Sequence, residues 1–290
     1  MPLSALALVV TAAFIHAYWN LLVKRAGGGS AFVWLFSFAT AVLYAPVVAV
    51  LVWIEPLSYG ALEWGLIASS GILHLLYAVT LNRGYRLADL SVVYPIARGT
   101  GPLISSVGAI LLLGEQPGAV GALGIALIVI GILVIAGAWT PALYRASARA
   151  AKGLGYGIAT GLCIAAYTLN DAYAVKVLLV SPIMIDYFGN LVRLAFLTPS
   201  VAANLTALQA EWRRNVRMAV YVGALMPLSY ILSLFAMRLA PVSYVAPARE
   251  LSMLVGAYFG AKLLQEGHTR QRIIGTALMI GGIVGLALSQ

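Results

Sequence analysis

Hydrophobic residues run along the chain in long blocks that short polar segments separate. We place ten blocks, at roughly residues 3–23, 31–53, 64–82, 91–113, 118–138, 153–175, 182–203, 216–237, 243–264 and 272–289. Each block is close to the length of about 20 apolar residues that a helix needs to cross a bilayer. The pattern predicts an all-α integral membrane protein with ten transmembrane helices.

Composition excludes the ordinary soluble classes. The 290 residues are 62% hydrophobic and only 9% charged, and the mean hydropathy is +0.96. No ordinary soluble domain needs so many apolar residues. The connectors are too short for a water-borne domain, so we expect the chemistry to lie between the helices. Cys163 is the only cysteine, so no internal disulfide forms, and we expect no metal site and no cofactor.

The distribution of positive charge predicts an orientation. The formal net charge is +9, but the cations stand in ones, twos and threes between apolar blocks, so their partners should be membrane lipids and not nucleic acid. Counted from the N-terminus, the odd connectors hold thirteen Lys and Arg residues and the even connectors hold two. Because such residues collect on the cytoplasmic side, the odd connectors should be cytoplasmic and both termini should lie outside.

The two halves of the chain repeat each other. The segment "GYRLADLSVVYPIARGTGPLISSVGAILLLGE" (84–115) aligns with "AMRLAPVSYVAPARELSMLVGAYFGAKLLQE" (236–266) with one deletion. The matched residues are Pro95 and Pro247, Arg98 and Arg249, Glu115 and Glu266, and, in the helix that follows, Gly124 and Gly131 with Gly275 and Gly282.

Five helices per copy is an odd number, so the second copy enters the membrane from the opposite side. Such inverted repeats are typical of secondary transporters. We therefore divide the chain into a first five-helix repeat (1–139), a basic hinge (140–152) and a second, inverted five-helix repeat (153–290), with a central cavity between the repeats.

Short motifs at matching places carry a family resemblance. "YRLADLSVVYPI" and "MRLAPVSYVAP" begin helices four and nine, an acidic residue ends each of these helices, and "WNLLVK" closes helix one. In these features the chain resembles the EamA-type branch of the drug/metabolite transporter superfamily. The resemblance implies a solute carrier whose helices 1, 3, 4, 6, 8 and 9 surround a cavity, with helices 5 and 10 at the periphery. It also implies cytoplasmic termini, against the charge count, and favours export.

Arg98 and Arg249 lie inside apolar blocks. A lone arginine near the bilayer centre costs at least about 2.5–3.5 kcal/mol, so each should face water or an acidic partner. Each follows a proline, Pro95 or Pro247, which removes a helical hydrogen bond and opens the backbone toward a cavity. This pattern favours a discontinuous helix at a substrate site, with the prolines as hinges. In the alternative, structural interpretation, Glu250 neutralises one arginine in a permanent buried pair.

Other polar residues fall on the helices that the family places around the cavity. Besides Arg98, Arg249 and Glu250, the residues that we expect to bind substrate are His16, Trp19, Asn20, Tyr77, Tyr94, Tyr167, Asn170, Tyr230 and Tyr244. Each of them has an alternative role in helix packing or in the aromatic belt. Asp171, Asp186 and Arg193 are interpreted as interfacial or interhelical, and Glu115 and Glu266 as caps of the helices that follow them.

These features predict a monomeric secondary transporter of the bacterial inner (cell) membrane that moves a small-molecule substrate by alternating access. An amino acid is favoured, because guanidinium groups suit a carboxylate, Glu250 or tyrosine oxygens suit an ammonium group, and aromatic walls suit an apolar side chain. A broad-specificity metabolite or drug exporter is the alternative. No HExxH, GxSxG or Walker motif occurs, so we expect neither an enzyme nor an ATP-driven pump.

Overall fold

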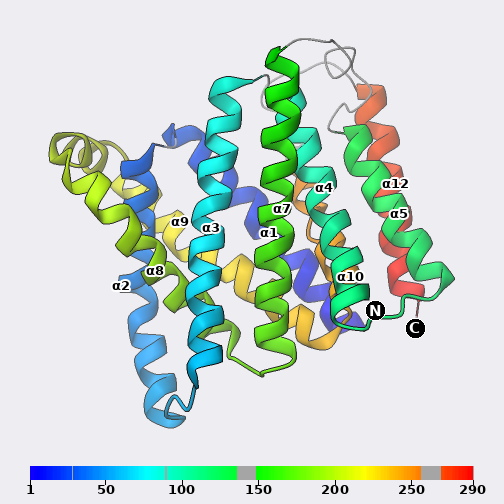
Figure 1. Ribbon diagram of the computed structural model, residues 1–290, viewed down its shortest axis with the longest axis horizontal. Coiled ribbons are helices and arrows are strands. Elements are labelled where there is room, and N and C mark those ends of the chain that lie inside the picture. The colour runs from blue at the N-terminus through cyan, green and yellow to red at the C-terminus, as the bar shows by residue number, and fades with distance from the viewer. Residues whose placement is uncertain (28, 89, 136–147, 256–268, 290) are drawn as a thin grey trace.

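The protein is described by a computed structural model that covers residues 1–27, 29–88, 90–135, 148–255 and 269–289. Within these ranges every regular element is a helix, which confirms the predicted all-helical class (Figure 1). The helices are α1 (Leu3–Ala26), α2 (Ser30–Ile54), α3 (Ala61–Leu87), α4 (Leu90–Leu112), α5 (Ala119–Ile135), α7 (Ala148–Lys176), α8 (Pro182–Ala202), α9 (Leu205–Leu239), α10 (Val242–Ala248) and α12 (Thr269–Leu288).

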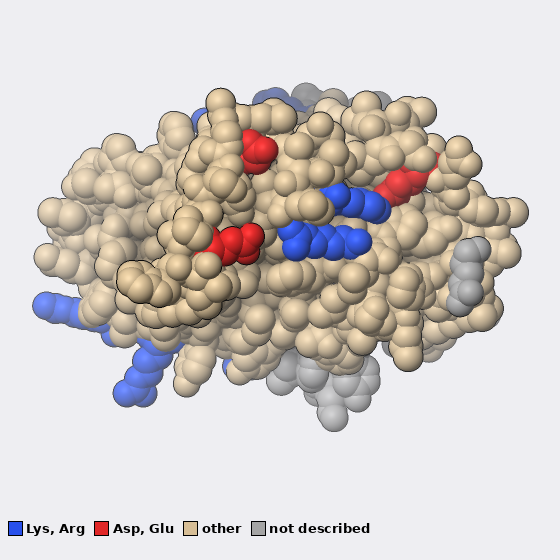
Figure 2. Space-filling view, turned by 90° about the horizontal axis from the view of Figure 1, so that it is seen from below, with Lys and Arg blue, Asp and Glu red and all other residues tan. Residues whose placement is uncertain are grey.

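The surface of the bundle is that of a membrane protein. Helices α1, α2, α3 and α9 are long and apolar enough to cross a bilayer. Large apolar side chains, among them Trp53, Leu111 and Leu123, point outward and are more than half exposed. Seen from one end, acidic and basic side chains gather near the centre, a few basic side chains project at the rim, and most of the visible face is uncharged (Figure 2). Backbone groups paired inside helices and apolar flanks are what lipid requires.

Two elements begin within segments that the sequence assigned to connectors. Helix α9 begins at Leu205, eleven residues before the predicted block, and continues through the basic segment that contains Arg213, Arg214 and Arg217. The side chain of Asn204 accepts a hydrogen bond from the backbone N–H of Ala207 at 3.1 Å and caps the helix there. Helix α7 begins at residue 148, inside the predicted hinge 140–152, and residues 136–147 lie outside the described ranges.

Glycines bring helices α5 and α12 into direct contact. The carbonyl of Gly282 faces Gly124 and that of Gly275 faces Gly131, so the two helices run antiparallel. A Cβ atom added at Gly124 or Gly131 would lie only 2.8 or 2.7 Å from the facing oxygen. In lipid, where helices gain nothing from the hydrophobic effect, such close backbone contact is a main source of association. The pair stands at one edge of the bundle (Figure 1).

A second glycine face joins α7 to α4. Gly153, Gly157 and Gly161 recur every four residues along α7 and therefore share one face. A Cβ atom at Gly157 would lie 2.7 Å from the Ile96 side chain, and one at Gly161 would overlap the Thr100 hydroxyl. This contact runs along α4, which is one continuous helix through Pro95. The predicted break in α4 is therefore not observed.

The repeat-related segment is broken instead. Helix α10 ends at Ala248, and the backbone turns at Arg249 and Glu250 before it becomes helical again over 251–255. The turn is closed by bonds between residues three apart, from the N–H of Glu250 to the carbonyl of Pro247 at 3.1 Å and from Met253 to Glu250 at 2.8 Å. Pro247 itself is buried. The break thus places Arg249 and Glu250 at a point where the backbone changes course.

Candidate functional site

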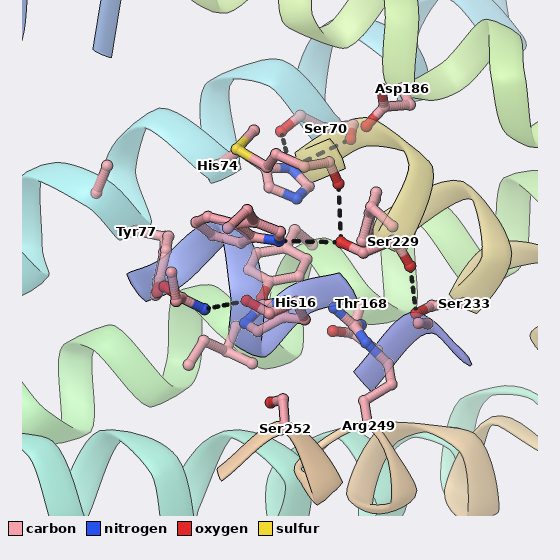
Figure 3. Close-up of a pocket in the computed structure, with 18 of the residues that line it drawn as sticks. His16, Ser70, His74, Tyr77, Thr168, Asp186, Ser229, Ser233, Arg249 and Ser252 are labelled. Carbon is pink, nitrogen blue, oxygen red and sulfur yellow. Dashed lines mark hydrogen bonds between the residues drawn. The ribbon is translucent and has the colours of Figure 1, made fainter. Parts of the chain in front are cut away.

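A cavity of about 280 Å³ lies between the helices (Figure 3). Its wall comes from α1, α2, α3, α4, α7, α8, α9 and the segment around the turn after α10. On α1 the lining extends from Ala12 to Val23, and on α3 from Ser70 to Asn82, so the cavity occupies the C-terminal part of both helices. It extends toward the end of the bundle where Asn82 is exposed, which we call the open end.

The opposite end, which we call the sealed end, is closed by packed side chains. Val9, Ile67, Ala109, Met237 and Val242 belong to one core cluster there and are 1% exposed or less. These residues lie nearer than the cavity lining to the start of α1, the start of α3 and the end of α9. Packed side chains therefore close the cavity at this end of the bundle.

Hydrogen bonds reinforce the sealed end. The carboxylate of Glu115 accepts bonds from the N–H groups of Val242 at 2.6 Å and Ser243 at 2.8 Å, and from the Lys176 ammonium at 3.0 Å. Glu115 therefore caps α10 and not the following helix α5, which corrects the sequence interpretation. The Arg238 guanidinium donates to three carbonyls, those of residues 175, 179 and 180. We call Glu115, Lys176 and Arg238 the latch.

The latch is a group of hydrogen-bonded charges at the sealed end. Burial alone would raise the pKa of Glu115, but hydrogen bonds from Ser243, Val242 and Lys176 outweigh it and hold the pKa below the ordinary value. Lys176 also donates to the carbonyl of Ala240 at 3.0 Å. Because the bonded groups come from the α4–α5 connector, α7 and the start of α10, the latch ties these parts together.

Arg98 and Glu250 form an ion pair in the cavity wall. The Arg98 Nη1 atom lies 3.1 Å from Oε2 and 3.4 Å from Oε1 of Glu250, and both side chains are mostly buried. The Arg98 guanidinium also stands over the ring of Tyr94, 5.7 Å from its centroid. A buried charge needs such a partner, because removing it from water without one is costly. Glu250 thus neutralises Arg98 and leaves Arg249 for other partners.

Arg249 lies in the same wall with a different environment. Its guanidinium is 5.0 Å from the centroid of the Tyr230 ring, and within the described part of the chain it makes no ion pair. Its side chain projects into the cavity opposite Ser229 and Ser233 (Figure 3). A guanidinium on an aromatic face keeps its N–H donors available for a ligand oxygen. Arg249 is therefore the cation best placed to bind an anionic group.

Aromatic rings and histidines form much of the remaining wall. His74 stacks on Tyr167 at 4.1 Å and meets the edge of Tyr230 at 5.1 Å. His16 packs against Trp19 at 4.7 Å, and its Nε2 atom is buried without a hydrogen-bond partner within the described residues. The other predicted residues that line the cavity are Asn20 and Tyr77.

Three predicted site residues do not line the cavity. Tyr244 points at Gly121 of α5, where its hydroxyl occupies the space beside the glycine. Asn170 donates to the carbonyl of Leu66 and to Asp171, so it joins α3 to α7. Tyr94 lies beneath Arg98. These residues are on predicted cavity helices, but on faces that turn toward neighbouring helices. The side chain of Pro95 and the whole of Glu266 lie outside the described part of the structure.

Helix α8 adds residues that the sequence analysis assigned to the interface or to helix contacts. Asp186, Asn190 and Arg193 all line the cavity. The Arg193 Nη2 atom donates to the Asn190 side-chain oxygen at 2.6 Å, and Asn190 donates to the carbonyl of Ser37 at 2.9 Å. Their spacing of four and three residues marks one helix face, and this signal could have identified them. They were missed because α8 was not among the helices expected to surround the cavity.

Asp171 lies behind the cavity wall and is fully buried. Its carboxylate accepts hydrogen bonds from the Ser70 hydroxyl at 3.0 Å, the Asn170 amide at 2.9 Å and the Tyr230 hydroxyl. These bonds connect α3, α7 and α9, in keeping with the interhelical interpretation. Tyr230 therefore contacts Asp171 through its hydroxyl and Arg249 through its ring.

Comparison with known proteins identifies the fold. No family model matches the chain, and no curated protein matches it. A solved crystal structure is similar to it with a TM-score of 0.75 and 14% sequence identity, and the match covers 98% of each chain. At this identity the likeness shows a common fold, which extends over nearly the whole of both chains.

Proposed function

We propose that the protein is a secondary transporter of the EamA type, in the drug/metabolite transporter superfamily, that moves small zwitterionic metabolites, amino acids foremost, by alternating access. The proposal includes ten transmembrane helices in two inverted five-helix repeats. The observation that carries it is a central cavity with charged and aromatic walls that reaches one end of an apolar helix bundle. Such a cavity is where a carrier binds its solute.

The exchange of packing partners supports the inverted repeats. Helix α1 packs on α9 as α7 packs on α3, and α2 packs on α9 as α8 packs on α3. Gly71 of α3 faces the carbonyl of Gly189 on α8, and Gly223 of α9 faces the carbonyl of Phe36 on α2. Gly71 and Gly223 are 152 residues apart, the same spacing that relates Pro95 to Pro247. Two copies related by a twofold axis exchange partners in this way.

The chemistry of the wall supports a zwitterionic substrate. Arg249 offers N–H donors for a carboxylate, and Asp186 offers a carboxylate for an ammonium group. The stacked rings of Tyr167 and His74 offer apolar surface against which a substrate side chain can pack. The volume of about 280 Å³ lies just below the usual range of about 300–1,000 Å³ for ligand pockets, which favours a small metabolite over a bulky drug.

Counterflow in proteoliposomes tests the proposal. The purified protein is loaded with unlabelled solute and challenged with tritiated amino acids, nucleosides, sugars and lipophilic cations in turn. We expect exchange of amino acids, abolished by Arg249→Gln and retained in Arg214→Gln, which removes an exposed arginine far from the cavity wall. Exchange of lipophilic cations without amino acids would favour the broad-specificity exporter, and exchange of no class would contradict the transporter proposal.

A further inference from the structure

Asp171 is a buried carboxylate that forms no ion pair within the described part of the chain. It is 0% exposed, and among the described residues no lysine, arginine or histidine forms an ion pair with it. Its three hydrogen-bond donors, Ser70, Asn170 and Tyr230, are all neutral groups. Burial of an unpaired negative charge is unfavourable, and neutral donors offset only part of that cost. The site therefore favours exchange of the charge for a proton more strongly than a salt-bridged carboxylate would.

The donors around Asp171 suit both protonation states. A hydroxyl group can donate or accept a hydrogen bond, whereas an ammonium or a backbone N–H can only donate. When the carboxylate is charged, the hydroxyls of Ser70 and Tyr230 donate to it. When it is protonated, its new O–H group can donate to one of these oxygens. The Ser70 hydroxyl oxygen also lies 3.5 Å from His74 Nδ1, whose N–H donates to the Ser70 carbonyl at 2.9 Å. In either state the Asp171 carboxyl group therefore has a hydroxyl group with which it can form a hydrogen bond.

The same residues connect Asp171 to the cavity. Tyr230 and His74 line the cavity and separate it from Asp171. The charged and titratable groups around Asp171 are His74 on α3, Asp186 on α8, Tyr230 on α9 and Arg249 after α10. Of the other cations in the wall, Arg98 on α4 is neutralised by Glu250, and Arg193 on α8 donates to Asn190 and faces Asp186. Arg249 is thus the one cation in this group whose charge a ligand can cancel.

We propose that Asp171 is a proton-binding site that couples substrate transport to proton transport, with Arg249 as the link. A substrate carboxylate on Arg249 cancels the positive charge that favours the charged form of Asp171. The Asp171 carboxylate then takes up a proton from the solution that the cavity faces, through the hydroxyls of Ser70 or Tyr230, and becomes a neutral carboxylic acid. By reciprocity, the protonated form binds the substrate carboxylate more tightly.

Cooperative binding means that the substrate and the proton cross together. The proton is released, and the carboxylate restored, when the cavity faces the other side and the substrate leaves Arg249. A gradient of protons then drives the solute in the same direction. This inference rests on the proposed transport function. In it, the proton gradient determines the direction of net substrate movement, whereas the family resemblance favoured export.

Two measurements on the same proteoliposomes separate the inference from the function on which it rests. Counterflow of an equimolar mixture of tritiated L-amino acids, at equal pH on both sides, tests transport alone. Uptake of the same mixture from an acidic outer solution tests coupling. For one proton per substrate, a gradient of one pH unit can drive accumulation up to about tenfold, since each factor of ten in concentration matches one pH unit.

We expect the wild type to accumulate the mixture and Asp171→Asn only to equilibrate it, while both show counterflow. Glu55→Gln is the matched control, because Glu55 is an exposed carboxylate at the end of α2, and it should accumulate like the wild type. If the wild type shows counterflow but no accumulation, the coupling is contradicted and the transporter proposal stands. Accumulation by Asp171→Asn would have the same two consequences. Absence of wild-type counterflow contradicts transport itself.

A second measurement decides the matter if Asp171→Asn does not fold. Addition of the amino-acid mixture to lightly buffered wild-type protein in detergent should raise the pH, because binding draws a proton onto Asp171. Arg249→Gln should abolish this uptake. A constant or falling pH in the wild type contradicts cooperative binding of proton and substrate.

Discussion

The two ends of the cavity carry the same kinds of residue in different arrangements. At the sealed end, Lys176 bonds to Glu115, and Arg238 bonds to carbonyl groups at the end of α7 and in the connector after it. Lys24 and Arg86 precede Lys176 and Arg238 by 152 residues, lie at the open end, and have exposed side chains. At these repeat-related positions, the basic residues are therefore hydrogen-bonded at the sealed end and exposed at the open end.

The difference shows that a basic residue at a helix end can have two roles. The even connectors contain only Lys176 and Arg238, and the protein itself bonds both. At the open end, exposed residues such as Lys24 and Arg86 can meet anionic headgroups. In an alternating-access carrier, the two arrangements would exchange when the cavity changes sides.

Labelling from one side of the membrane should distinguish the sealed end from the N-terminal extension of α9. After Cys163→Ala, the exposed position Val177 at the sealed end and the exposed position Arg214 on the N-terminal extension of α9 are each changed to cysteine. If the odd connectors are cytoplasmic, a membrane-impermeant thiol reagent should label Val177→Cys in intact cells and leave Arg214→Cys unlabelled. The reverse pattern would place the sealed end in the cytoplasm and overturn the charge-based orientation.

Charge reversal at Glu115 should open the sealed end. Glu115→Lys replaces three hydrogen bonds to a carboxylate by repulsion from Lys176 and from the start of α10. Hydrogen bonds to charged groups contribute about 1.5–3 kcal/mol each, so labelling of Ala109→Cys, buried in this core, should rise at least about tenfold. Glu55→Lys in the same Cys163→Ala background is the control. Unchanged labelling of Ala109→Cys would show that apolar packing alone closes this end.

Matched lysine substitutions should separate the two ends. Lys176→Met removes a charge-assisted bond to Glu115 and one to Ala240, and should lower the free energy of unfolding by about 1 kcal/mol. Lys24→Met changes an exposed residue and should stay within about 0.5 kcal/mol of the wild type. Thermal unfolding in detergent measures both. Equal effects at the two positions would remove the asymmetry on which the comparison rests.

The stabilisation that Glu115 gives to the latch should depend on pH. Although burial alone would raise it, the pKa of Glu115 lies below the ordinary value of 4.5, because hydrogen bonds favour the charged form. The charged latch therefore stabilises the protein fully above this value and loses its contribution as the pH falls through the lowered pKa. The melting temperature of Glu115→Gln should be below that of the wild type at neutral pH. This difference should shrink in acid; a constant difference would contradict the assignment.

Local patterns predicted the helical class well, because lipid demands long apolar runs with paired backbones. They placed the start of α9 eleven residues late, since hydropathy falls at the charged segment 211–217 while nothing there interrupts a helix. Asn204 fixes the true start through its bond to Ala207, and such a cap is readable only once the helix is known. Hydropathy thus locates the part of a helix in lipid, and capping locates its ends.

Partners in the other half of the chain were harder to predict. The sequence placed Glu115 before α5 and indicated a cap for that helix, but its carboxylate meets N–H groups more than 120 residues away. Glu250 was named as the partner of one arginine, yet the choice of Arg98 over its neighbour Arg249 depends on the direction of each side chain at the helix break. The neighbours of a helix face, and not spacing along the chain, determine these contacts.

The glycine pair of α5 and α12 has a consequence for how the chain can be divided. Gly124 and Gly131 belong to the first half and Gly275 and Gly282 to the second, so this contact joins the halves without the covalent hinge. Residues 1–139 and 153–290 produced as two separate polypeptides should therefore find each other in the membrane, as two subunits of a dimer would. The peptide link between them sets their ratio and proximity, while the helix contact provides the adhesion.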